Sequence, residues 1–66
     1  MKNKLKLLRE NLGFTQDQLA TLVDVSRQTI ISLEREKYDP SIQLAFKLSK
    51  IFSCTIEDIF IFKEES

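Results

Sequence analysis

The chain has 66 residues, with ten basic and ten acidic side chains, no histidine and one cysteine. A chain of this length forms one small domain (1–66); its single cysteine excludes an internal disulfide, and the lack of histidine argues against a zinc site. No apolar run approaches the roughly 18 residues that a membrane span needs, and the first residues lack the features of a secretion signal. We therefore expect a single cytoplasmic domain without a metal, a cofactor or a membrane partner.

The first two predicted helices are indicated by apolar spacing and by their ends. Leucines recur at helical spacing from Leu5 onward, and Gly13 follows as a stop, which predicts a helix at about 4–12. Thr15 is followed three positions later by a glutamine, which is the arrangement of a capping box. It predicts that a second helix begins there and covers about 16–23.

The third predicted helix follows a short turn. Asp24 can adopt the left-handed conformation that ends the second helix, and Ser26 is a suitable N-cap for a helix at about 27–36. Successive helical residues are rotated by about 100°, so Ile30 and Leu33 fall together on a side that faces the core. The other side mixes a guanidinium, an amide, a hydroxyl and an aliphatic group: Arg27, Gln28, Ile31, Ser32 and Arg35. A helix that only covers a core shows a plainer charged face, so this face is expected to contact a partner.

The last part of the chain predicts two more helices and a strand. Ser41 caps a helix that runs to about Phe52, and Thr55, followed three positions later by an aspartate, caps a short fifth helix. The run 59–62 is apolar at every position, which a short helix with one buried face cannot hide. It is better explained if the fifth helix passes into a strand. We expect that strand to pair with residues 1–3 in a two-stranded sheet.

The same apolar run has two possible uses. It could belong to the core of its own domain, or it could form the interface between two subunits. We favour the interface, which would consist of Ile59, Phe60, Ile61 and Phe62.

A resemblance to a known family joins these elements. The spacing of Gln16, Leu19–Ala20, Val25–Ser26, Ile30 and Glu34 resembles the helix-turn-helix of the phage repressor and Cro family, also called the Xre family. The segments PSIQLAFKLSKIF and TIEDIF resemble the family's fourth and fifth helices, so that the resemblance covers about 4–60. In its length and in the blocks SRQTI and EDIF, the chain is most similar to the compact cytolysin-operon repressor type. The resemblance implies an all-α, five-helix lambda-repressor-like domain.

The resemblance also implies that the third helix enters the major groove of DNA with its first residues at the base edges. The base-reading residues would be Arg27, Gln28, Ile31 and Ser32, which are the residues of the outer face described above. Arg27 can fork onto guanine, Gln28 can pair with adenine, and Ile31 can meet the methyl group of thymine.

Two further sets of residues are carried over by position. Contacts with DNA phosphates are expected from Gln16, Thr29, Arg35, Lys37 and Tyr38. Arg9 and Glu34 are expected to form a structural ion pair between the first and third helices. The family often has glycine where Asp24 and Glu36 stand.

These observations predict a sequence-specific DNA-binding regulator, a repressor that binds an inverted-repeat operator as a homodimer in the nucleoid. Its partners would be double-stranded DNA and a second copy of itself, with no small-molecule effector domain. The alternative is a protein-interaction module, such as an antitoxin or co-regulator subunit, which the zero net charge and the apolar run favour. An enzyme is not expected, because the chain lacks histidine, a base beside its thiol and a Gly-rich phosphate loop.

Overall fold

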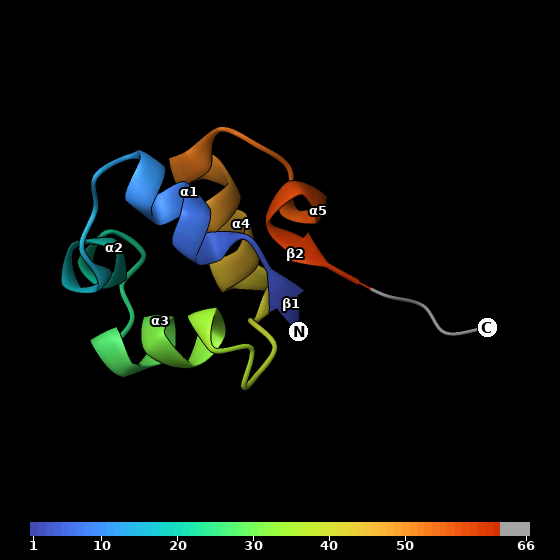
Figure 1. Ribbon diagram of the computed structural model, residues 1–66, viewed down its shortest axis with the longest axis horizontal. Coiled ribbons are helices and arrows are strands. Elements are labelled where there is room, and N and C mark those ends of the chain that lie inside the picture. Colours follow the sequence, from blue (N-terminus) through green and yellow to red (C-terminus); the bar gives the residue numbers. More distant parts are fainter. Residues whose placement is uncertain (63–66) are drawn as a thin grey trace.

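Five helices and two short strands follow one another in the computed structural model, which describes residues 1–62 (Figure 1). In chain order the elements are β1 (Lys2–Asn3), α1 (Leu5–Asn11), α2 (Gln16–Leu22), α3 (Arg27–Glu34), α4 (Ile42–Phe52), α5 (Ile56–Ile59) and β2 (Phe60–Ile61). The two strands pair antiparallel, with Lys2 opposite Ile61 and Asn3 opposite Phe60. The predicted five-helix fold with a small terminal sheet is therefore confirmed. None of the helices within residues 1–62 combines the length and the apolar character needed to cross a membrane.

The starts of four helices are fixed by the capping residues that the sequence predicts. The Thr15 hydroxyl accepts a hydrogen bond from the backbone N–H of Gln18 at 3.0 Å, and the Gln18 side chain accepts one from the backbone N–H of Thr15 at 2.9 Å. Thr55 and Asp58 form the same reciprocal pair at the start of α5. The other two helices are capped by serines, Ser26 for α3 and Ser41 for α4. Each such cap typically contributes about 1 kcal/mol, which is why these starts are visible in the sequence.

The two turns that flank α3 each contain a residue in the left-handed conformation. Asp24 has a φ of 58° between α2 and α3, and Glu36 has a φ of 60° after α3. The family that the sequence resembles often has glycine at both positions, and a residue with a Cβ adopts this conformation at a cost of about 1–2 kcal/mol. The backbone N–H of Glu36 turns back to the Leu33 carbonyl at 2.9 Å. This turn ends α3 at Glu34, two residues before the predicted end.

The hydrophobic core receives side chains from all five helices of the described residues and from β2. The buried apolar residues are Leu5, Leu19, Ala20, Val23, Ile30, Leu33, Leu44, Ala45, Leu48, Ile59 and Phe60. Because α3 contributes only one side to this core, its opposite side is left for solvent or a partner.

The predicted subunit interface requires a correction at two of its four residues. Ile59 is fully buried and Phe60 is only 5% exposed, because both pack into the core of their own chain. Their prediction as interface residues is wrong, since a side chain already buried in the subunit offers no surface to a second one. Ile61 and Phe62 are 40% and 76% exposed. The apolar run is therefore divided between core and surface.

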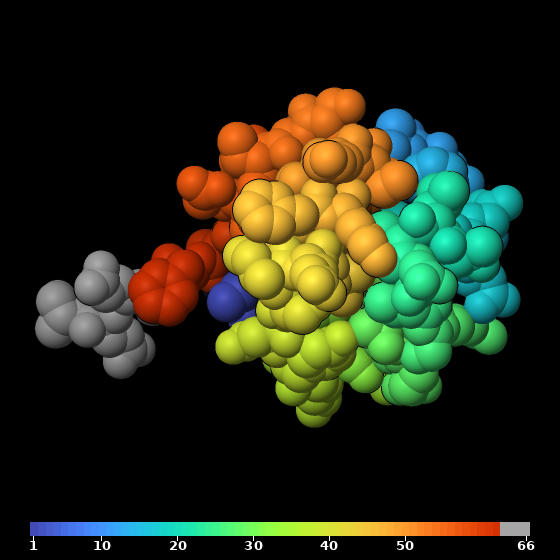
Figure 2. Space-filling model, turned by 180° about the vertical axis from the view of Figure 1, so that it is seen from behind, coloured from blue at the N-terminus to red at the C-terminus, as the bar shows by residue number. Residues whose placement is uncertain are grey.

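A second exposed apolar pair lies on α4, which occupies the middle of the face shown in Figure 2. Ile42 and Phe46 are one helical turn apart, and they are 66% and 54% exposed. They belong to a different element from Ile61 and Phe62. The apolar surface of the described chain is not confined to these two pairs, since other exposed apolar residues lie elsewhere: Leu7, Leu12, Leu22 and Tyr38.

Candidate nucleic-acid interface

The position of α3 is set by its short connection to α2. Val23 is buried at the end of α2, and the backbone N–H of Val25 donates to the Ala20 carbonyl at 3.0 Å. Ser26 then accepts from the backbone N–H of Thr29 at 3.2 Å, which starts α3. The result is a tight helix-turn-helix in which α3 lies along one edge of the molecule (Figure 1).

The outer face of α3 holds the predicted base-reading residues. Arg27 and Gln28 are exposed, whereas Ile31 and Ser32 are half-buried. The Gln28 amide lies 3.5 Å from the Ser32 hydroxyl, one turn further along the helix. The structure therefore brings the four residues onto one surface, with the two longest polar side chains at the N-terminal end of the helix. Fork-like donors at that end match the groove-reading geometry of helix-turn-helix proteins.

A basic groove runs beside this face, between α3 and the starts of α1 and α2. It consists of two adjoining clefts that share Lys6, Gln16 and Arg27. The first cleft is completed by Arg9, Thr15 and Asp17, and the second by Ile31, Glu34 and Arg35. Lys6, Arg27 and Arg35 are exposed cations, and among the described residues none of them forms an ion pair. Such a groove attracts anions, including the phosphate groups of a nucleic acid.

Lys6 is a part of this groove that was not among the predicted site residues, because the sequence alone favours a solvated surface for it over a role in a DNA groove. The structure places it beside Arg27, although the two residues belong to α1 and α3. A signal was present in the sequence, because residues three apart share a helix face. Lys6 stands three residues before Arg9, so the expected pairing of Arg9 with Glu34 turns the side chain of Lys6 toward α3.

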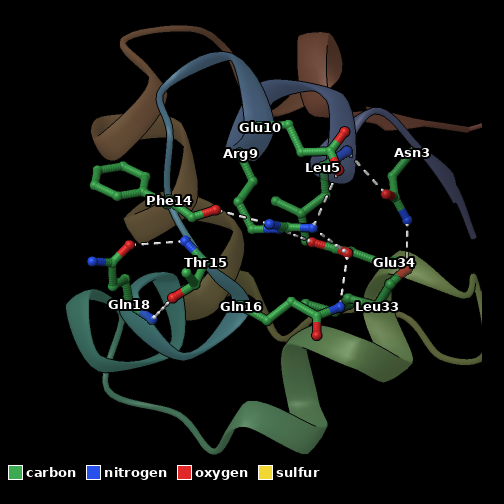
Figure 3. Close-up of polar contacts among 10 residues, drawn as sticks. All are labelled: Asn3, Leu5, Arg9, Glu10, Phe14, Thr15, Gln16, Gln18, Leu33 and Glu34. Carbon is green, nitrogen blue, oxygen red and sulfur yellow. Dashed lines mark hydrogen bonds and ion pairs between the residues drawn. The ribbon is translucent and has the colours of Figure 1, made fainter.

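The floor of the groove is a buried ion pair between α1 and α3 (Figure 3). Arg9 Nε donates to Glu34 Oε2 at 2.6 Å, and Arg9 Nη2 donates to Glu34 Oε1 at 3.2 Å. Arg9 Nη1 also donates to the Phe14 carbonyl at 2.8 Å. The hydrogen bond with Glu34 raises the pKa of Arg9 above its ordinary value, against the opposing effect of burial.

Gln16 joins the same network from α2. Its side-chain Nε2 donates to Glu34 Oε1 at 3.1 Å, so that Glu34 connects three helices (Figure 3). The amide nitrogen carries a second N–H, which leaves one donor for another contact. Gln16 therefore has a structural contact in addition to the phosphate contact predicted for it.

The remaining predicted phosphate residues are spread over a wider surface. Thr29 is half-buried, and its hydroxyl oxygen lies 3.0 Å from the hydroxyl oxygen of Ser26. Lys37 and Tyr38 are exposed in the loop after α3, and they line neither cleft of the groove. Of the predicted set, the structure thus gathers only Gln16 and Arg35 into the basic groove.

Comparison with known proteins is consistent with this arrangement. The helix-turn-helix family matches residues 5–59 of the chain. A protein named an uncharacterized HTH-type transcriptional regulator, from Methanocaldococcus jannaschii, is 55% identical over 65 residues, which is 98% of each chain. The HTH-type transcriptional regulator YgzD of Bacillus subtilis is 46% identical over the full length of both chains. A competence pilus inhibition repressor of Acinetobacter baylyi is 33% identical over 60 residues, which is 91% of this chain and 54% of that protein.

The fold and the exposed face of α3 define a helix-turn-helix protein of the class that binds DNA. The chain belongs to the Cro/C1-type helix-turn-helix family, and it is a transcriptional regulator of that family. The family is non-enzymatic, which agrees with the expectation from the sequence.

Proposed function

We propose that this regulator is a repressor that binds an inverted-repeat operator as a homodimer, with α3 in the major groove. The observation that carries the proposal is the outer face of α3, where exposed Arg27 and Gln28 stand beside the basic groove. The resemblance to the compact cytolysin-operon repressor type and the name of the Acinetobacter baylyi relative support repression. Such a repressor acts in the cytoplasm, at the nucleoid.

Sequence would be read by four side chains of α3. Arg27 presents a planar fork that fits guanine O6 and N7, and Gln28 presents an amide that fits adenine N6 and N7. Ile31, half-buried between these polar groups, fits the methyl group of thymine. Ser32 contributes a small hydroxyl that can bond to either kind of base. Each good two-point contact discriminates against a wrong base by about 1–3 kcal/mol.

The register on DNA would be set by contacts with phosphates. Lys6, Arg35 and the free N–H of Gln16 belong to the basic groove, so they would follow one strand of the backbone. Thr29, Lys37 and Tyr38 would add contacts outside the groove. These contacts carry no sequence information, but they hold α3 at one depth and one angle.

Two subunits would associate through the exposed apolar residues Ile61 and Phe62. The partner reads the second half of an inverted repeat, and the two recognition helices stand about one DNA turn, roughly 34 Å, apart. Repression would follow from occlusion of a promoter, without any chemical step. No small-molecule effector domain is part of this proposal.

The test is selection of bound DNA from a random pool at moderate salt, with the purified full chain. We expect an enriched inverted repeat whose half-sites are separated by about one helical turn. The matched control is the double variant Arg27→Ala, Gln28→Ala, which should retain its fold and lose the enrichment. If the wild-type protein is folded and enriches no sequence, the proposal is wrong, and the alternative of a protein-interaction module is favoured.

A further inference from the structure

The side chain of Asn3, in β1, lies at the junction of three elements (Figure 3). Its Nδ2 donates to the Leu33 carbonyl at 2.7 Å and to the Met1 carbonyl at 3.1 Å. Its Oδ1 accepts from the backbone N–H of Leu5 at 3.0 Å. The amide nitrogen thus donates to two carbonyls and the amide oxygen accepts from one N–H, so both ends of the amide have partners. Asn3 is half-buried, and its three side-chain hydrogen bonds are partly shielded from solvent.

One of these contacts lies at the end of the recognition helix. The last carbonyls of a helix have no partner within the helix, and they need donors from elsewhere. Leu33 is the penultimate residue of α3, and its carbonyl already accepts from the backbone N–H of Glu36 at 2.9 Å. The 2.7 Å bond from Asn3 is an additional contact, and it comes from a residue 30 positions earlier in the chain.

The same residue is held firmly from the other side. Asn3 pairs with Phe60 in the two-stranded sheet, and the next residue, Lys4, donates its backbone N–H to the Ile59 carbonyl at 2.7 Å. Ile59 and Phe60 are both core residues. The backbone N–H of Asn3 also donates to Glu36 Oε2 at 3.2 Å. The end of α3 is therefore attached to a strand that is itself anchored in the core.

We infer that Asn3 is a positioning residue for DNA reading, which holds the C-terminal end of α3 at the angle that the base contacts require. The inference rests on the proposed function, because it assumes that α3 reads DNA. Near its N-terminal end α3 is held by the turn from α2, and at Glu34 by Arg9. Without the Asn3 amide the Leu33 carbonyl loses its hydrogen bond to β1, and the attachment that remains is the backbone N–H of Asn3 on the Glu36 side chain, beyond the end of the helix. The last turn of α3 can then pivot about the contacts that are left.

A pivot of this kind affects the two modes of DNA binding differently. Base contacts tolerate errors of about 0.5 Å and 10–20°. Long cationic side chains follow a phosphate over larger movements, so non-specific binding depends less on the angle of the helix. Loss of the Asn3 bond should therefore lower specific affinity more than non-specific affinity.

The experiment uses three variants of the full chain. Asn3→Ala removes both ends of the amide. Asn3→Ser keeps an oxygen that can accept from the Leu5 N–H, but it is too short to reach the Leu33 carbonyl, and it carries the test if Asn3→Ala does not fold. Asn11→Ala, which changes an exposed asparagine at the end of α1, is the matched control.

The first measurement is amide hydrogen exchange without DNA. The amides of Arg35, Glu36 and Lys37 close the end of α3 by donating to the carbonyls of Ile31, Leu33 and Ser32. Relative to a core amide such as that of Leu48, we expect their exchange to be about fivefold faster in both Asn3 variants, since one hydrogen bond contributes about 1 kcal/mol. Unchanged relative exchange, or the same change in Asn11→Ala, would overturn the inference.

The second measurement is affinity for the DNA that the wild-type protein selects and for a scrambled duplex, at a temperature where all variants are folded. We expect specific affinity to fall about tenfold in Asn3→Ser and non-specific affinity to fall by less than about threefold. Equal losses on both duplexes would show that Asn3 stabilises the fold without positioning α3 for reading. If the wild-type protein selects no DNA, the proposed function fails, and the inferred role in reading fails with it. Faster exchange at the end of α3 would in that case show that the attachment itself exists.

Discussion

The groove end and the sheet end of the molecule expose side chains of different polarity. At the groove end, Arg27 and Arg35 form no ion pair with any residue among 1–62, and the polar face of α3 is left without a partner. At the sheet end, β1 and β2 pair with each other, and the exposed residues Ile61 and Phe62 are apolar, beside the exposed Lys2. The groove end thus offers several cations and hydrogen-bond donors, and the sheet end offers mainly hydrocarbon.

This difference explains how so short a chain can expose two surfaces of different chemical character. The free cations can stay unpaired because Arg9 and Glu34 fix the helices beneath them. The free apolar side chains can stay exposed because Ile59 and Phe60, one step earlier in the sequence, already complete the core. Each surface adjoins buried residues: the Arg9–Glu34 ion pair under the groove, and Ile59 and Phe60 beside the exposed apolar pair. A substitution in the buried residues should therefore lower the free energy of unfolding, whereas a substitution on the surface should weaken binding.

The largest expected effect is a loss of folding stability when the buried Arg9–Glu34 ion pair beneath the groove is broken. Glu34→Gln leaves the Arg9 guanidinium buried without its charge partner, and removing one member of a buried pair typically costs about 3–5 kcal/mol. The matched control is Glu10→Gln, because Glu10 lies 3.9 Å from Arg9 but is exposed. We expect that control to cost less than about 1 kcal/mol. Urea unfolding measures both values, and equal losses would contradict a structural role for the buried pair.

The next effect is on the surface of the groove end. Arg27→Ala should weaken specific DNA binding by about 1–3 kcal/mol and non-specific binding by less. Its stability should change by no more than about 0.5 kcal/mol, because the side chain is exposed and unpaired among the described residues. Lys47→Ala, which removes an exposed cation from α4, is the control. Fluorescence anisotropy with both kinds of duplex makes the comparison, and an equal loss on both would reassign Arg27 to a phosphate contact.

A substitution at the exposed apolar residues of the sheet end should weaken the association of two subunits without unfolding either one. Phe62→Glu is expected to raise the dissociation constant of the homodimer at least about tenfold, because a carboxylate replaces an apolar contact surface. The subunit itself should remain stable, since Phe62 is 76% exposed. Sedimentation equilibrium measures the association. The matched control is Phe46→Glu on α4, another exposed phenylalanine; dissociation by that variant alone would place the interface on α4 instead.

Local signals in the sequence were sufficient for most of the fold. Thr15, Ser26, Ser41 and Thr55 each bond to an N–H group three residues away, so the start of a helix can be predicted from its own sequence. The end of α3 was less accessible, because it depends on Glu36 adopting a left-handed conformation that glycine adopts more readily. Propensity alone predicts no break at a glutamate.

Contacts between distant residues set the limit of prediction at the site. The apolar character of Ile59 and Phe60 is equally suited to a core and to an interface, and only the packing of α5 and β2 distinguishes the two. Asn3 gave no local signal, because its key bond joins it to Leu33. The outer face of α3, for which base reading is proposed, was predictable, since it follows from the helical period once Ile30 and Leu33 are assigned to the core.

The smallest expected effect compares the two capping boxes, which repeat one motif at the two ends with different chemistry. The box of α2 uses the neutral Gln18, whereas the box of α5 uses Asp58. Hydrogen bonds from Thr55, first from its backbone N–H and then from its hydroxyl, lower the pKa of Asp58 below its ordinary value. Because the folded pKa is the lower one, the unfolded chain binds the proton more readily. The stabilisation is therefore complete at neutral pH, and it is lost as pH falls below about 4 and through the folded pKa.

Asp58→Asn should therefore lower the melting temperature slightly at pH 7 and by a smaller amount near pH 3, below the unfolded pKa, where the stabilisation from the ionised carboxylate is already being lost. Comparing variant with wild type at each pH cancels the titration of the other acidic groups. Asp17→Asn, in the first turn of α2, is the control, because Asp17 makes no capping bond among residues 1–62. A difference between Asp58→Asn and wild type that stays constant from pH 7 to pH 3 would mean that the charge of Asp58 adds nothing to the cap. The two boxes would then be equivalent, and the ends of the molecule would differ only in the surfaces that they expose.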